Sequence, residues 1–160
     1  MAGELDPYVV PGSQTLRNKP GLQSEAALRA FEYERSAARS VQLQERPIGG
    51  RFDLEHLKAV HRHLFQDVYD WAGQPRTTGL SKGGSSFIRA QLIEPAGEQL
   101  AAKLEANGHL KGLDKATFTR KLTEHFAAWN SVHAFREGNG RALREFFGEL
   151  ARGAGYAIDH

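Results

Sequence analysis

The chain has 160 residues, 40% hydrophobic and 25% charged, which is the size and composition of one globular domain. It has no cysteine, so disulfides, thiolate metal sites and a cysteine nucleophile are excluded. The net charge is only +2 and the basic residues are dispersed, so we expect no direct nucleic-acid binding. No apolar run approaches a membrane span and no signal-peptide pattern opens the chain, which predicts a cytoplasmic protein without a membrane partner.

Residues 1–21 are rich in proline and glycine, which predicts an irregular N-terminal arm. Apolar stripes at helical spacing then predict a mostly α domain. The expected helices run from Ser24 to about Gln44, from Asp53 through Trp71, from Pro95 to Asn107, from Asp114 towards His133, and from the end of the 133–144 segment to about Gly153.

Three histidines, His56, His61 and His63, lie on the second expected helix. A metal site is conceivable there, but positions 61 and 63 face different sides of a helix. Hydrogen-bonded or solvated side chains are the expected alternative.

Residues 76–89 interrupt the helical pattern. Short ends containing threonine, serine and phenylalanine flank Lys82-Gly83-Gly84, which predicts a small β-hairpin, with an ordinary loop as the alternative.

The densest cluster of chemically useful residues is 133–144, His-Ala-Phe-Arg-Glu-Gly-Asn-Gly-Arg-Ala-Leu-Arg, between two expected helices. Gly138 and Gly140 free the backbone to direct amides at an anion, beside a helix N-terminus that also attracts anions. Arg141 and Arg144 share a helix face and can reach a phosphate.

A carboxylate beside an anion site needs a cation, and Glu137 is suited to Mg²⁺, which takes one or two carboxylates plus substrate phosphates. His133 lies on the other side of the loop, where a neutral imidazole can accept a proton from a hydroxyl. The alternative is that the Gly-Asn-Gly segment is only a turn and the arginines only a solvated face.

This segment resembles the Fic motif His-Pro-Phe-x-Asp/Glu-Gly-Asn-Gly-Arg-x-x-Arg, and it matches every fixed position except the proline, replaced by Ala134. The resemblance implies one Fic-like domain over residues 1–160, with a flap at 76–89 over the active site. It implies transfer of AMP from ATP to a Ser, Thr or Tyr hydroxyl of a target protein. In this interpretation His133 is the base and Glu137 the Mg²⁺ ligand. The phosphates are held by Gly138, Asn139, Gly140, Arg141 and Arg144, and the target by Ser81, Lys82, Gly83, Gly84, Ser85, Ser86 and Phe87.

Ala134 lacks the ring that stops a helix, so we expect the preceding helix to run on and the loop to be looser. A slower enzyme follows from this. The alternatives left open are transfer of another nucleotide or phosphate-containing group, and a Fic-like binding module with weak chemistry.

Many Fic proteins carry an inhibitory Ser/Thr-x-x-x-Glu-Gly/Asn helix, but no glutamate here has Ser or Thr four residues earlier. Either the inhibitor is a separate protein or it lies beyond residue 160. Residues 11–19 also resemble the entry segment of stand-alone bacterial Fic toxins, and this resemblance favours a separate small helical antitoxin. Type II DNA topoisomerase subunits are candidate targets. A bacterial cytoplasmic location is expected, with delivery into another cell as an alternative.

Overall fold

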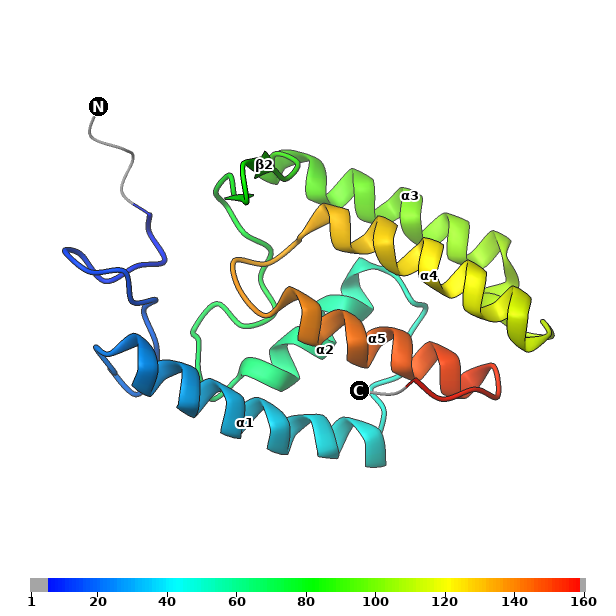
Figure 1. The fold of residues 1–160 in the computed structure, drawn as a ribbon, viewed down its shortest axis with the longest axis horizontal. Helices are drawn as coiled ribbons and strands as arrows, with labels where there is room; N and C mark the ends of the chain where they lie inside the picture. The colour runs from blue at the N-terminus through cyan, green and yellow to red at the C-terminus, as the bar shows by residue number, and fades with distance from the viewer. Residues whose placement is uncertain (1–5, 159–160) are drawn as a thin grey trace.

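The computed structural model describes residues 6–158, and α-helices form most of this part of the chain (Figure 1). The mostly α prediction is confirmed; the first five residues of the expected arm lie outside the described residues. The helices are α1 (Glu25–Glu45), α2 (Leu54–Phe65), α3 (Ile93–Ala106), α4 (Lys115–Val132) and α5 (Asn139–Gly153), with short 3-10 helices η1 (Ala90–Leu92) and η2 (Gly108–Leu110).

Three of the helices begin where the sequence predicts, because polar side chains cap their first turns. Ser24 accepts a hydrogen bond from the Ala27 N–H at the start of α1. Asp53 and Asp114 do the same for the third backbone N–H of α2 and α4. Such a cap satisfies an otherwise free donor and stabilises the helix by about 1 kcal/mol.

The core lies where α2 and α5 pack against each other, with α1 on one side and α3 and α4 on the other (Figure 1). Helix α5 is amphipathic, and its apolar face is almost fully buried. The buried residues of that face include Leu143, Phe146, Phe147 and Leu150. The loop 133–138 therefore connects two elements that are both fixed by the core.

The second helix is shorter than the sequence predicts. It ends at Phe65 rather than continuing to Trp71, although Val68 and Tyr69 are buried. The carbonyl of Val68 accepts a hydrogen bond from the Lys19 N–H in the N-terminal arm, and the chain turns there. The apolar stripe continues because these side chains belong to the core, and periodicity alone does not separate a helix from a buried turn.

The expectation that Ala134 lets the preceding helix run on is wrong. Helix α4 ends at Val132, and His133 adopts a left-handed conformation with φ 50° and ψ 62°. Ala134 and Phe135 are both buried, so packing draws the chain out of the helix without a proline. The side chain of Arg76 also binds the carbonyls of Val132 and His133 at this helix end.

Within the segment 76–89, β1 (Ser81–Lys82) pairs antiparallel with β2 (Ser85–Ser86). The pairing sets Ser81 opposite Ser86, and the Phe87 N–H donates to the Leu80 carbonyl just outside the strands. The chain thus forms a hairpin here, shorter than the segment predicted from sequence. Among residues 6–158, no helix combines the length and apolar character needed to span a membrane.

Candidate active site

The loop between α4 and α5 is held by its own buried side chains. Phe135 is buried, and Asn139 clamps it by accepting from the Phe135 N–H at 2.9 Å and donating to the Phe135 carbonyl at 2.7 Å. The Asn139 side chain therefore faces inward. An anion could therefore be bound by the backbone N–H of Asn139, at the start of α5, and not by its side-chain amide.

The two glycines of the loop have different structural roles. Gly138 has φ +82°, and a Cβ there would lie 2.4 Å from the Phe65 ring, so only glycine fits. A Cβ on Gly140 would meet only the Arg144 Nη1, at 3.9 Å. Gly140 is therefore not needed for packing. Its missing side chain leaves space for a group that approaches the backbone closely.

The motif residues line a cavity of about 400 Å³. His133, Glu137, Gly138, Asn139, Gly140, Arg141 and Arg144 all line it. From the predicted flap, Ser81 and Phe87 line the same cavity, together with Leu80. Gly83 and Gly84 at the exposed tip do not line it, and neither does the exposed Ser86, which pairs with Ser81. Lys82 and Ser85 are described only by their backbone.

The motif arginines face α1. Arg141 donates to the Ser36 hydroxyl, and its guanidinium lies over the Tyr33 ring, 5.4 Å from the ring centre. Arg144 is exposed and lines both the main cavity and a neighbouring one beside Glu145. Two cations thus lie on the first two turns of α5, close to its N-terminus, where a chain of phosphates could extend.

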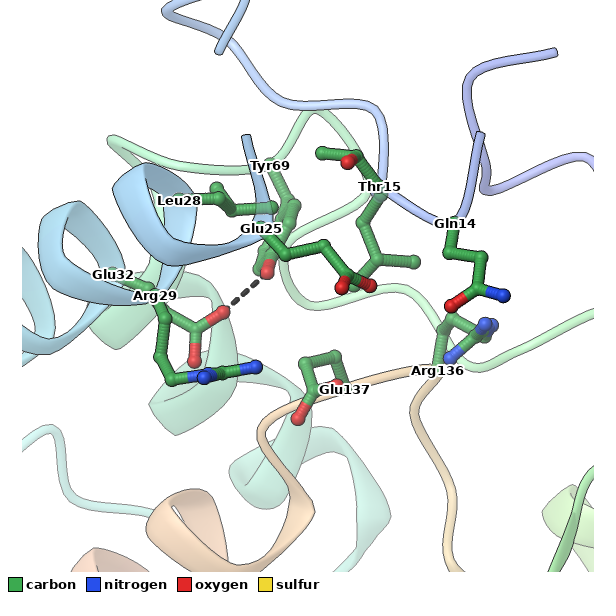
Figure 2. Close-up of a pocket in the computed structure, with 10 residues that line it drawn as sticks. Gln14, Thr15, Glu25, Leu28, Arg29, Glu32, Tyr69, Arg136 and Glu137 are labelled. Carbon is green, nitrogen blue, oxygen red and sulfur yellow. Dashed lines mark hydrogen bonds between the residues drawn. The ribbon is translucent and has the colours of Figure 1, made fainter. Parts of the chain in front are cut away.

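Glu137 lies between the main cavity and a second one of about 400 Å³, which reaches the N-terminal arm (Figure 2). In the second cavity the Tyr69 hydroxyl donates to the Glu32 carboxylate. Burial raises the pKa of Glu32, and Glu137 adds to the rise. Figure 2 shows Arg29 pointing into the same space, so the acidic groups lie close to cations.

No cluster of three or more potential metal ligands occurs in the described part of the chain. A cation at Glu137 would need further ligands from water or substrate. Mg²⁺ commonly binds in this way, with one or two carboxylates and several phosphate or water oxygens.

His61 of α2 is fully buried and fixes the backbone at Glu137. Its Nδ1 accepts from the Gly73 N–H and its Nε2 lies near the Glu137 carbonyl oxygen, each at 2.9 Å. Because Nδ1 is an acceptor, the proton must lie on Nε2, which donates to the carbonyl. Burial lowers the pKa of His61 to about 4, so the ring is neutral near pH 7.

The expectation that these histidines are hydrogen-bonded is met by their contacts in the structure. His63 interacts with the Gln42 side chain, and the His56 Nε2 lies 3.0 Å from the Glu149 carboxylate. The contact of His61 with the motif loop was not predicted from sequence. The available signal was that His61 follows Val60 on the apolar side of the helix.

Comparison with known proteins gives a consistent result. The Fic/DOC family model matches residues 51–151. The chain is 41% identical to the protein adenylyltransferase VbhT of Bartonella schoenbuchensis over 98% of its own length and 33% of that protein. It is 38% identical to the probable protein adenylyltransferase Fic of Escherichia coli K12, over 96% of the chain and 76% of that protein.

Among solved structures, the BepC effector of Bartonella tribocorum with bound AMPPNP superposes with a TM-score of 0.87 at 28% identity. The match covers 95% of this chain and 80% of BepC. The chain thus spans about a third of VbhT but most of the Escherichia coli protein and of BepC. The extent of the family match and the arrangement of the 133–144 segment lead to one conclusion: the chain belongs to the Fic/DOC family.

Proposed function

We propose that this chain is a protein adenylyltransferase that moves AMP from ATP to a hydroxyl side chain of a target protein. The observation that carries the proposal is one cavity lined by a histidine, a carboxylate, a helix N-terminus and two arginines. Relatives named as adenylyltransferases and the AMPPNP bound to BepC support the same reaction.

In the proposed reaction the target hydroxyl oxygen attacks the α-phosphorus of ATP, the bond to the β-phosphate breaks, and pyrophosphate leaves. His133 accepts the hydroxyl proton. The backbone amides of residues 138–140 hold the phosphates through the N-terminus of α5, and Arg141 and Arg144 hold the outer ones. Mg²⁺ would be held by Glu137 and would offset phosphate charge.

The hairpin is proposed to bind the target. Its backbone edge is exposed, and Ser81 and Phe87 connect it to the cavity that holds His133. An extended target segment that pairs with this edge would be held by main-chain bonds, which fix its position without demanding a particular sequence. A hydroxyl on that segment could then be presented to His133.

The direct test is intact-mass analysis of candidate targets after incubation with the chain, Mg²⁺ and either ATP or UTP. We expect a mass increase of one AMP with ATP and none with UTP. A UMP adduct would favour the alternative donor, and no adduct with either nucleotide despite ATP binding would favour a binding module. Purified type II topoisomerase subunits are the first targets to try, followed by bacterial lysate.

Control by a separate antitoxin is also proposed. Arg144 is exposed and belongs to none of the ion pairs found between residues 6 and 158. A glutamate from a Ser/Thr-x-x-x-Glu-Gly/Asn helix could pair with it and occupy the position of an outer phosphate. Growth arrest by the chain should disappear when such a partner is co-expressed and return when the partner's glutamate is changed to glycine.

A further inference from the structure

Arg76 lies between α2 and the hairpin and is almost completely buried, with 2% of its surface exposed. Its guanidinium donates to four backbone carbonyls, two at the end of α4 and one on each side of the hairpin. Nε binds His133 at 2.7 Å and Nη1 binds Thr78 at 2.7 Å, while Nη2 binds Ile88 at 2.6 Å and Val132 at 3.2 Å. One side chain therefore joins the end of α4, the base of the hairpin and the residue that carries the proposed base.

The charge of Arg76 is stabilised by carbonyl dipoles. Burial lowers the pKa of Arg76, but arginine keeps its proton even when buried. The carbonyls of Val132 and His133 close helix α4, where the aligned peptide dipoles leave partial negative charge. A planar fork with five donors suits this arrangement, whereas a lysine ammonium has three donors around one point.

The same segment also holds the ring of His133. The Phe87 ring stacks on the His133 ring with centres 3.9 Å apart and planes 8° from parallel. Arg76 begins this segment and binds Ile88 near its other end, which closes the base of the hairpin. The backbone and the ring of His133 are therefore both in contact with residues 76–88.

His133 needs such support because its backbone is strained. Its φ of 50° is a left-handed conformation that non-glycine residues seldom adopt. The anion-binding side of the loop is held by different contacts, from Asn139 to Phe135 and from His61 to Glu137. The support of His133 is thus separate from the support of the amides at the start of α5.

We propose that Arg76 is a positioning residue for His133 and links the orientation of this base to the hairpin. The proposal rests on the proposed function, because it assigns a role in the same transfer reaction. It predicts that altering Arg76 lowers kcat while leaving ATP binding intact. Misplacing a reacting group by about 1 Å can lower a rate about 100-fold.

The test compares Arg76→Lys with wild type and with Arg39→Lys. Arg39 is the matched control, because this residue of α1 donates two hydrogen bonds to the Asp67 carboxylate, and neither residue lines the cavity. We expect kcat to fall about 10- to 100-fold in Arg76→Lys, with the Kd for ATP within about threefold of wild type. Arg39→Lys should leave both unchanged. Equal losses in kcat and ATP affinity, or a wild-type kcat, would overturn the proposal.

A second measurement does not depend on activity. In isotope-labelled protein, the NMR shifts of the His133 ring should change in Arg76→Lys, while those of His63, bound to Gln42 on another face, should not. If wild type transfers nothing, the proposed function fails, and this spectrum still decides whether Arg76 orients His133. Phe87→Leu leaves Arg76 and its four hydrogen bonds in place, so it tests the same link if the Arg76 variants do not fold. An unchanged kcat and unchanged His133 shifts in Phe87→Leu would contradict the link to the hairpin.

Discussion

The motif loop, residues 133–138, and the hairpin face the same cavity but are built in opposite ways. The loop has Ala134 and Phe135 in the core, and Asn139 and His61 fix its backbone. The hairpin has strands of two residues, and its tip is exposed. A two-stranded hairpin is only marginally stable alone, so it can adjust when another strand pairs with it.

We propose that this difference separates the chemistry from recognition of the target. Phosphate transfer needs groups held in fixed geometry, and the loop supplies a fixed backbone. Recognition of an extended target needs free backbone groups and tolerates local movement. Substitutions in the loop should therefore have large and specific effects, and side-chain substitutions in the hairpin small ones.

The largest effect is expected for His133→Ala. Loss of a general base lowers kcat about 10²- to 10⁴-fold. The Kd for ATP should change little, because the phosphates are proposed to bind at α5 and the arginines. Single-turnover transfer and isothermal titration with ATP measure the two quantities. Transfer at the wild-type rate would show that another group accepts the proton.

The two loop glycines give a sharper test of the same region. Gly138→Ala should lower the free energy of unfolding by several kcal/mol, because it adds strain at a positive φ and a clash with Phe65. Gly140→Ala should fold normally but bind ATP roughly tenfold more weakly, a loss of about 1.4 kcal/mol. Thermal unfolding and ATP titration distinguish them. Normal ATP affinity in a folded Gly140→Ala protein would contradict close phosphate approach at this position.

Glu137→Gln tests the proposed cation site. The substitution keeps the shape but removes the charge, so ATP affinity with Mg²⁺ should fall roughly tenfold or more. Affinity without the metal should stay nearly unchanged. The carbonyl of glutamine can still accept the 3.2 Å contact from the Gly138 N–H. Equal losses with and without Mg²⁺ would indicate a structural role for Glu137.

The hairpin should respond more to its backbone than to its side chains. Ser81→Ala should change the KM for the target less than about twofold. Ser81→Pro removes a backbone N–H, and a lost hydrogen bond of about 0.5–1.5 kcal/mol corresponds to a rise in KM of roughly 2- to 10-fold. ATP affinity serves as the control in both variants. Equal KM values for alanine and proline would argue against strand pairing at this residue.

Sequence reasoning predicted most of what depends on local pattern. The capping residues Ser24, Asp53 and Asp114 correctly predicted where three helices start. The 133–144 motif predicted a group of residues that line one cavity in the structure. Side-chain caps and glycine turns act over a few residues, so a single sequence displays them.

The missed features depend on contacts distant in sequence. Arg76 reaches Val132 and His133, and these contacts help to end α4 where sequence predicted that the helix would run on. His61 reaches the Glu137 carbonyl 76 residues away. Nothing local to a buried arginine or histidine reveals which backbone carbonyl it binds. The sequence therefore indicated the groups that we propose for the chemistry, but not the side chains that hold them in place.

The smallest effect on activity at neutral pH is expected for His61. Its contribution is visible only in how the stability of the fold depends on pH. Its pKa is lowered by burial to about 4, from 6.5 in the unfolded chain. Above pH 6.5 the ring is neutral in both states and its contribution to stability is complete. As the pH falls from 6.5 towards 4, the unfolded state binds the proton first, so stability falls by up to roughly 3 kcal/mol.

Burial disfavours the charged ring, and protonated His61 also has donors on both nitrogens, so it can no longer accept from the Gly73 N–H. Urea unfolding at pH 7, 6 and 5 measures the slope, which should be much smaller in His61→Gln. His63→Gln on the same helix is the control, because that ring is only partly buried, and it should keep most of the slope. A His61→Gln protein with the wild-type pH dependence would show that His61 is not held neutral against the motif loop.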